Sequence, residues 1–135
     1  MAEVVVIPPT GAIEVVEKSD PLAFARRYLA AGVDIVSAPD RRHVLAVDGC
    51  GAGRLPQNPR GWACYGRSML YGAVVLWADD GGRVDPDLVQ MVRSLPDHVD
   101  VDAIEAEPDC VVLPRGGAVT GVLLDAAKAY WSVRV

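Results

Sequence analysis

The fold of this chain is decided by residues 54–77, which read RLPQNPRGWACYGRSMLYGAVVLW. They begin with a loop that contains Pro56 and Pro59, continue through arginine and aromatic side chains, and end in the most apolar run of the sequence, at residues 72–78. A continuous apolar run of this length is typical of a buried strand. We therefore expect residues 72–78 to form a buried strand that follows a stiff, proline-bounded loop.

Short apolar runs elsewhere predict more strands. Residues 3–7 and 12–16 flank a turn rich in proline and glycine, and this pattern is typical of a β-hairpin. Residues 33–37 alternate apolar and polar side chains, as a half-buried strand does, and residues 43–48 form a further strand after the next turn. Two later segments, 99–103 and 110–113, are also strand candidates.

Two Asp-Pro pairs mark the starts of helices. An aspartate at the N-cap accepts a hydrogen bond from a free backbone N–H group, and a proline fits the first helical turn. Asp20-Pro21 and Asp85-Pro86 therefore predict helices that end at Gly32 and before Pro96. The tail is open to two interpretations, a helix over residues 121–131 and a final strand over residues 132–135.

Together these elements predict an α+β fold in which residues 1–135 form a single domain. We expect a mostly antiparallel, mixed sheet with two or three helices. About half of the 135 residues are apolar, so the chain can bury a core without disulfides or a metal.

Composition restricts the class of protein. The formal net charge of −5 argues against a dedicated nucleic-acid binder, which usually carries a basic charge. The three cysteines form no C-x-x-C pair, which favours free thiols in a reducing compartment. No stretch approaches the roughly 18–20 apolar residues of a membrane span, and the N-terminus lacks the pattern of a signal peptide. We therefore expect a soluble, cytoplasmic protein that does not enter a membrane.

The charges are unevenly distributed along the chain. Residues 41–67 contain five arginines and a single aspartate, whereas residues 97–109 contain six acidic residues and no lysine or arginine. Charge runs usually form solvated surface. The alternative is an anion-facing patch together with an acidic segment that meets a basic partner.

No set of residues forms a convincing catalytic or metal site. The glycine-rich loop at residues 49–53 lacks the lysine of a phosphate-binding loop, and we expect no helix to begin directly after it. Cys64 and His43 are a conceivable nucleophile and base, with Arg60 and Arg67 favouring the thiolate, but a small buried side chain is the simpler interpretation of Cys64. We expect no catalytic residue, no bound metal and no cofactor.

The loop between residues 54 and 67 is the best candidate for a binding surface. Its arginines can pair with phosphate or carboxylate groups, its aromatic rings can stack on a ligand or a partner, and its asparagine is held between two prolines. The candidate site residues are Arg54, Asn58, Arg60, Trp62, Tyr65 and Arg67. The alternative is that the loop caps the sheet, the aromatic rings fill the core, and the asparagine satisfies backbone groups.

Residues 55–66, LPQNPRGWACYG, followed by residues 70–76, LYGAVVL, resemble the domain of unknown function 3846 family. The resemblance extends over residues 3–80 and implies a small domain of the kind found in actinobacteria, other bacteria and phages, without implying an activity. Cys64 stands where that family often has threonine. On this basis residues 1–80 are the family-like core and residues 81–135 an extension packed on it.

These observations predict a small, non-enzymatic accessory protein of phage or mobile-element type that acts by binding a host protein. The first alternative is a protein that binds a nucleotide or another small anion through Arg54, Arg60 and Arg67. The second is a weak nucleic-acid binder that uses residues 41–67. Self-association is compatible with each of them.

Overall fold

The computed structural model describes residues 1–29, 32–52, 54–96 and 118–134. Within them the chain forms an α+β fold with a five-stranded antiparallel sheet, which confirms the predicted fold class. The strands are β1 (Ala2–Ile7), β2 (Glu14–Lys18), β3 (Val33–Ser37), β4 (His43–Asp48) and β5 (Val74–Ala78). The helices are α1 (Pro21–Leu29), α2 (Pro59–Tyr65), α3 (Pro86–Ser94) and α5 (Ala118–Arg134).

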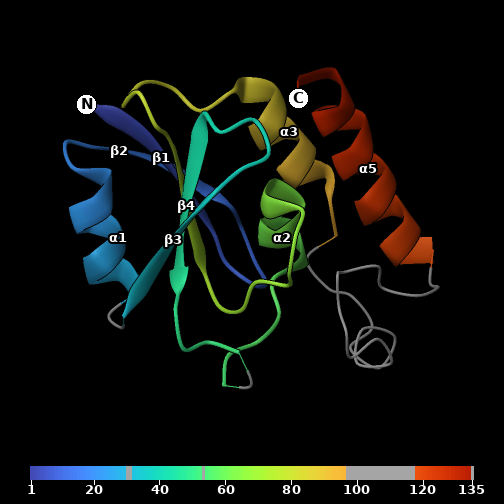
Figure 1. The fold of residues 1–135 in the computed structure, drawn as a ribbon, viewed down its shortest axis with the longest axis horizontal. Helices are drawn as coiled ribbons and strands as arrows, with labels where there is room; N and C mark the ends of the chain where they lie inside the picture. Colours follow the sequence, from blue (N-terminus) through green and yellow to red (C-terminus); the bar gives the residue numbers. More distant parts are fainter. Residues whose placement is uncertain (30–31, 53, 97–117, 135) are drawn as a thin grey trace.

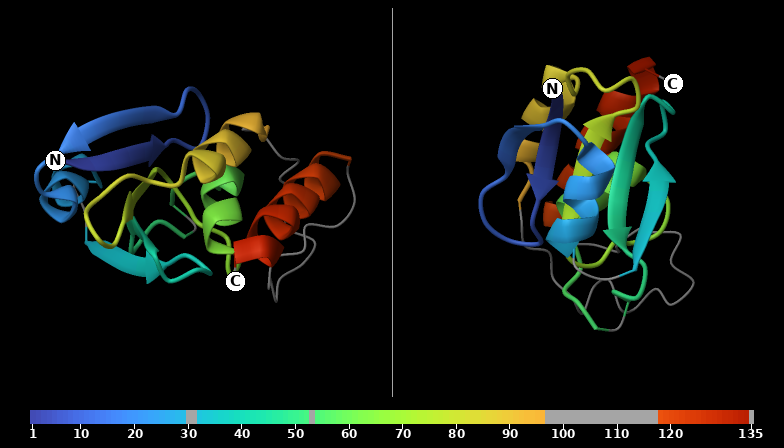
Figure 2. Two further views of the ribbon diagram at one scale, coloured as in Figure 1. Left: turned by 90° about the horizontal axis from the view of Figure 1, so that it is seen from above. Right: turned by 90° about the vertical axis from the view of Figure 1, so that its left-hand side faces the viewer.

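The strand order β2-β1-β5-β4-β3 places β5 in the middle of the sheet. All five residues of β5 are buried, which explains why its sequence is a continuous apolar run. Helices α2, α3 and α5 lie on one side of the sheet and α1 lies on the other (Figures 1 and 2).

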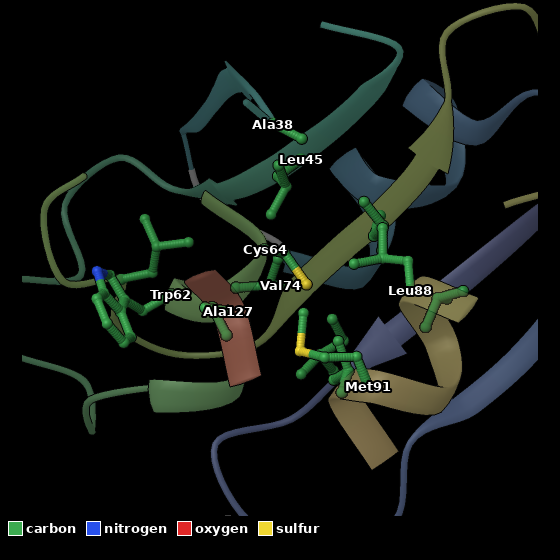
Figure 3. Close-up of a cluster of buried hydrophobic side chains, with 14 of the residues drawn as sticks. Ala38, Leu45, Trp62, Cys64, Val74, Leu88, Met91 and Ala127 are labelled. Carbon is green, nitrogen blue, oxygen red and sulfur yellow. The ribbon is translucent and has the colours of Figure 1, made fainter. Parts of the chain in front are cut away.

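The two sides of the sheet contain separate clusters of buried apolar side chains. Val74 and Leu76 face α2 and α3, whereas Val75 and Trp77 face α1, as the alternation of side chains along a strand requires. The larger cluster brings Trp62 from α2 together with side chains of α3 and α5 (Figure 3). Full burial of one leucine or valine side chain in these clusters contributes about 1.5–3 kcal/mol to the free energy of unfolding.

Helix α2 was not predicted, because residues 54–67 were interpreted as a loop. Asn58 is the N-cap of this helix, Pro59 occupies its first turn, and Gly66 ends it in the left-handed conformation with φ of 79°. Asparagine at the N-cap, proline after it and glycine past the end are helix signals. No helix begins directly after the glycine-rich loop, as expected, but α2 begins at Pro59, inside the segment that was interpreted as a loop.

The side chain of Asn58 connects three segments of the fold. Its Nδ2 donates hydrogen bonds to the carbonyl of Ile7 at 2.8 Å and to that of Gly72 at 2.9 Å. Its Oδ1 accepts a hydrogen bond from the N–H of Gly61 at 2.9 Å. Asn58 is fully buried, so these bonds satisfy groups that water does not reach.

Gly61 allows α2 to lie directly on β5. A Cβ atom at this position would come within 2.6 Å of Cγ2 of Val74 and within 3.2 Å of Cγ of Asn58. Distances this short between carbon atoms are strongly repulsive, so a larger residue would push the helix away from the sheet.

Other predictions differ from the structure in their boundaries. The second strand begins and ends two residues later than the predicted range of 12–16. The tail is a helix from Ala118 to Arg134, so the alternative of a final strand is wrong for residues 132–134. The predicted strands at residues 99–103 and 110–113 lie outside the described residues. Among the helices that the structure describes, none combines the length and apolarity needed to cross a bilayer.

Replacement of Asn58 by alanine tests the role of its hydrogen bonds. Asn58→Ala leaves two carbonyls and one N–H without a partner in a buried site, so we expect the free energy of unfolding to fall by about 3–5 kcal/mol. Urea unfolding followed by circular dichroism measures this change. The control is Gln57→Ala, since Oε1 of Gln57 accepts no hydrogen bond within the described residues, and its effect should stay within about 0.5 kcal/mol. Equal effects of both substitutions would contradict the proposed role.

Candidate functional site

The structure separates the six predicted site residues into two groups. Asn58, Arg60 and Trp62 are buried, with 0%, 5% and 3% of their surface exposed. Arg54 and Arg67 are exposed, and Tyr65 is half-buried. The prediction that all six side chains form one open surface is therefore wrong for the three buried residues.

The buried residues make intramolecular contacts. Nη2 of Arg60 donates a hydrogen bond to the carbonyl of Pro8 at 2.7 Å, and Nε1 of Trp62 donates one to the carbonyl of Arg67 at 3.3 Å. These contacts agree with the alternative interpretation, in which this segment caps the sheet and fills the core.

Arg54 is exposed but engaged within its own loop. Its Nη2 forms an ion pair with Oδ2 of Asp48 at 2.6 Å, and its Nε donates to the carbonyl of Cys50 at 3.4 Å. The other carboxylate oxygen of Asp48 accepts a hydrogen bond from the N–H of Cys50 at 2.8 Å. Arg54 therefore clamps the glycine-rich loop to the end of β4.

The remaining two residues, Tyr65 and Arg67, line a recess between the β3–β4 turn and the end of α2. Its volume is about 560 Å³. The lining consists of Val36, Ser37, Ala38, Pro39, Arg41, Tyr65, Gly66 and Arg67. This lining contains two arginines and no carboxylate, so the recess presents positive charge. Within the described part of the chain, the guanidinium groups of Arg41 and Arg67 make no hydrogen bond or ion pair.

Arg41 was not among the predicted site residues, although the Arg41-Arg42 pair after a proline turn was visible in the sequence. Its φ of 58° is the single positive value among the described residues other than glycine. A left-handed conformation costs a residue with a Cβ atom roughly 1–2 kcal/mol. Strain of this kind persists where the surrounding structure enforces it, and it is often found at functional sites.

Asp40 enforces the conformation of the turn that carries Arg41. Its Oδ1 accepts hydrogen bonds from the N–H groups of Arg42 and His43, at 2.8 Å and 3.2 Å, and its Oδ2 bonds Nδ1 of His43 at 2.8 Å. Partial burial acts to raise the pKa of Asp40, but these hydrogen bonds outweigh burial and lower the pKa below its usual value. The carboxylate is therefore the stable form, and it fixes the turn.

The C-terminal end of α2 also borders the recess, and helix carbonyls at such an end carry partial negative charge. Two of these carbonyls already accept hydrogen bonds. The carbonyl of Trp62 accepts one from the N–H of Gly66 at 2.7 Å, and that of Ala63 accepts one from Nε1 of Trp131 at 2.9 Å. These bonds reduce the negative field that an anion in the recess would meet.

A second recess of about 450 Å³ adjoins the first one and shares Val36 and Tyr65 with it. Asp34 and Asp48 lie in its lining. Asp48 is paired with Arg54, whereas the carboxylate of Asp34 makes no hydrogen bond or ion pair within the residues that the structure describes. The two recesses therefore lie side by side next to β3, and within the described residues the guanidinium groups of Arg41 and Arg67 in the first and the carboxylate of Asp34 in the second have no partner.

No family model, curated protein or solved structure matches this chain. The resemblance of residues 3–80 to the domain of unknown function 3846 family stays a prediction. Function must therefore be argued from the chemistry of the site.

The structure does not support a nucleophilic pair of Cys64 and His43. Cys64 is completely buried, and burial raises the pKa of its thiol to about 12. The expectation that Arg60 and Arg67 favour a thiolate is wrong, because desolvation outweighs their charge. His43 bonds Asp40 through Nδ1 and accepts a hydrogen bond from the N–H of Asp85 at Nε2, at 3.2 Å, so both of its ring nitrogens are engaged.

Asp85 also holds the C-terminal helix in place. Its Oδ2 accepts hydrogen bonds from the hydroxyl of Tyr130 at 2.6 Å and from Nε of Arg134 at 3.1 Å. Burial acts to raise the pKa of Asp85, but the hydrogen bonds from Tyr130, from the N–H of Asp87 and from Arg134 outweigh burial and lower the pKa. Across the described ranges, no group of three or more His, Cys, Asp or Glu side chains could hold a metal ion.

Replacement of Tyr130 by phenylalanine should lower stability in a pH-dependent way. The hydroxyl stabilises the ionised form of Asp85, so Tyr130→Phe should cost about 1–2 kcal/mol at pH 7. A carboxyl group with a lowered pKa contributes stability above its unfolded pKa and loses that contribution as the pH falls through its folded pKa. The cost should therefore shrink below about pH 4. Urea unfolding at pH 7 and pH 3 measures it. Tyr28→Phe, at an exposed hydroxyl without a hydrogen-bond partner in the described ranges, is the control and should have no effect at either pH.

Replacement of Arg41 by glycine should stabilise the protein. Glycine removes the left-handed strain of roughly 1–2 kcal/mol and loses about 0.5–1 kcal/mol through its more flexible unfolded state, so a net gain of about 0–1.5 kcal/mol in the free energy of unfolding is expected. Arg42→Gly is the matched control, since Arg42 has no positive φ and its replacement should lower stability. Thermal unfolding of both variants measures the difference. An Arg41→Gly protein that is no more stable than Arg42→Gly would show that the turn is not strained.

Proposed function

We propose that this protein is a non-enzymatic binding protein that captures a small anionic ligand in the recess lined by Arg41, Tyr65 and Arg67. One observation carries the proposal. Among the arginines around α2, Arg54 and Arg60 are engaged in intramolecular bonds, whereas the guanidinium groups of Arg41 and Arg67 have no partner within the described residues and line the same recess.

The chemistry of the recess fits a phosphate or carboxylate group. A guanidinium group presents its N–H donors in a planar fork that matches either anion with two parallel hydrogen bonds. Both arginines are also held at fixed points of the fold, Arg41 by the Asp40 turn and Arg67 by the bond from Trp62 to its carbonyl. These contacts order the backbones that carry the two guanidinium groups, and an ordered backbone loses less entropy when a ligand binds.

The size of the recess and its aromatic wall indicate which chemical group accompanies the anion in the ligand. A volume of about 560 Å³ lies within the range of roughly 300–1,000 Å³ that is usual for small-molecule sites. The half-buried ring of Tyr65 offers a surface on which a planar group can stack. A nucleotide has both a phosphate and a planar ring, so it is the ligand class to test first.

The rival predictions receive less support from the geometry. Binding of a host protein was predicted from a compact acidic domain with a rigid loop of arginine and aromatic side chains and no catalytic set, and three of the six candidate residues of that loop are buried. Binding of nucleic acid relies on an extended basic surface, whereas this recess offers two arginines in a chain with a net charge of −5.

Ligand titrations of matched arginine variants test the proposal. We expect inorganic phosphate or a nucleoside monophosphate to raise the melting temperature, because ligand at 100 times its dissociation constant adds about 2.7 kcal/mol to stability. Arg41→Gln and Arg67→Gln should each weaken binding by about tenfold to a hundredfold, the loss of one charge-assisted hydrogen-bonding group. Calorimetry measures the dissociation constants.

The control for these titrations is Arg27→Gln. Arg27 is exposed on α1, on the opposite side of the sheet, and its replacement changes the net charge by the same amount. The Arg27→Gln variant should bind the ligand with the same affinity as the unaltered protein. An equal loss of affinity in all three variants would show that overall charge, and not the recess, determines binding. The proposal would also be refuted if the protein bound no phosphate, nucleotide or carboxylate at millimolar concentration.

A further inference from the structure

The outer edge of β3 is open for pairing. Strand β3 is the last strand of the sheet, and it lies at the outer side in the right-hand view of Figure 2. The N–H of Ala38 donates to the carbonyl of His43 at 3.0 Å, and the N–H of Gly49 donates to that of Gly32 at 2.8 Å. Because hydrogen-bonded positions alternate along an antiparallel strand, the even-numbered residues of β3 bond β4.

The odd-numbered residues of β3 therefore direct their backbone groups away from β4. These residues are Val33, Ile35 and Ser37. Within the described residues, no other backbone or side-chain group forms a hydrogen bond with their N–H and C=O groups. A row of unpaired donors and acceptors of this kind is a template for another strand.

The two edge strands of the sheet differ in their charged side chains. Strand β2 carries three charged side chains among its five residues, Glu14, Glu17 and Lys18. Charged side chains on an edge strand discourage pairing with another chain. Strand β3 carries a single charge, Asp34, and exposes 47% of the apolar side chain of Ile35.

We propose that a second copy of this chain pairs with β3 in the antiparallel direction, with the two-fold axis at Ile35. The two sheets then become one continuous sheet. In this register Ile35 lies opposite Ile35 of the other copy, and Val33 lies opposite Ser37. Each residue whose backbone N–H and C=O point away from β4 therefore meets another residue of the same kind. Such directly opposed pairs exchange two hydrogen bonds each, and the apolar side chains on the α1 side cover one another.

The charges beside β3 select a second copy over an unrelated strand. In the same register Asp34 of one copy lies opposite Val36 of the other, and Val36 lines the recess that holds Arg41 and Arg67. The carboxylate of Asp34 in each copy thus approaches the guanidinium groups of Arg41 and Arg67 in its partner, and none of these groups has a partner within the described part of its own chain. A two-fold axis repeats this pairing, so the interface is complementary to itself.

The dimer should be weak. Pairing along one five-residue strand buries less surface than the roughly 1,600 Å² of a standard stable interface. We therefore expect self-association that depends on protein concentration in the micromolar to millimolar range. This inference rests on the strand register and on Arg41 and Arg67, the same two arginines that the proposed ligand would contact.

Sedimentation velocity over protein concentrations of about 1 µM to about 1 mM tests the inference. The full chain should shift from monomer to dimer. Ile35→Lys should weaken dimerisation by at least about tenfold, whereas Val15→Lys, at an exposed apolar residue of the β2 edge, should leave it unchanged. Circular dichroism must show that both variants are folded.

A charge exchange identifies the partner as a second copy. Asp34→Arg should weaken dimerisation. Addition of Arg67→Asp in the same chain should restore it, because positions 34 and 67 of the two copies then carry opposite charges again. A chain that stays monomeric up to about 1 mM, or a dimer that Ile35→Lys leaves intact, would overturn the inference. A monomer that binds an extended acidic peptide through Arg41 and Arg67 would assign the edge to another protein and would also overturn it.

Discussion

The three hydrogen bonds of the Asn58 side chain are the constraint on which the rest of this structure depends. They join the end of β1, the segment before β5 and the first turn of α2 in a site that excludes water. The helix that Asn58 caps lies on the central strand at the contact between Gly61 and Val74. Because α2 is short, fixing its start also fixes the position of Tyr65 and of the residues that follow.

The arginines around α2 fall into two groups that differ in their intramolecular contacts. Arg60 is buried and bonds a backbone carbonyl, and Arg54 neutralises Asp48 in a loop, so both contribute to the fold. Arg41 and Arg67 have no such partners among the described residues and face a recess of about 560 Å³. Arg41 also has the single positive φ among the described residues other than glycine, so this arginine combines a strained backbone with a place in the lining of the recess.

Much of the sheet could be predicted from the sequence, because the burial of β5 and the alternation in β3 are visible as patterns of apolar residues. Asp20 and Asp85 likewise revealed the starts of α1 and α3. Helix α2 escaped prediction because the two prolines around Asn58 were interpreted as a rigid loop, although Asn-Pro is also a helix start.

The site was harder to predict than the fold. A sequence does not show which arginines will find an intramolecular partner, since the carbonyl that binds Arg60 comes from Pro8, far along the chain. It also does not show the positive φ of Arg41, because arginine has no intrinsic preference for that conformation. Both features arise from contacts between segments that are distant in sequence.

The strand order has a consequence for the kinetics of folding. The β1–β2 and β3–β4 hairpins pair neighbouring segments, whereas β1 pairs with β5 through contacts such as Val4 with Trp77, which are far apart in the chain. Closing long loops before their contacts form is entropically costly and slows folding. The two hairpins can therefore assemble early, and insertion of β5 between them is the step at which we infer the transition state to lie.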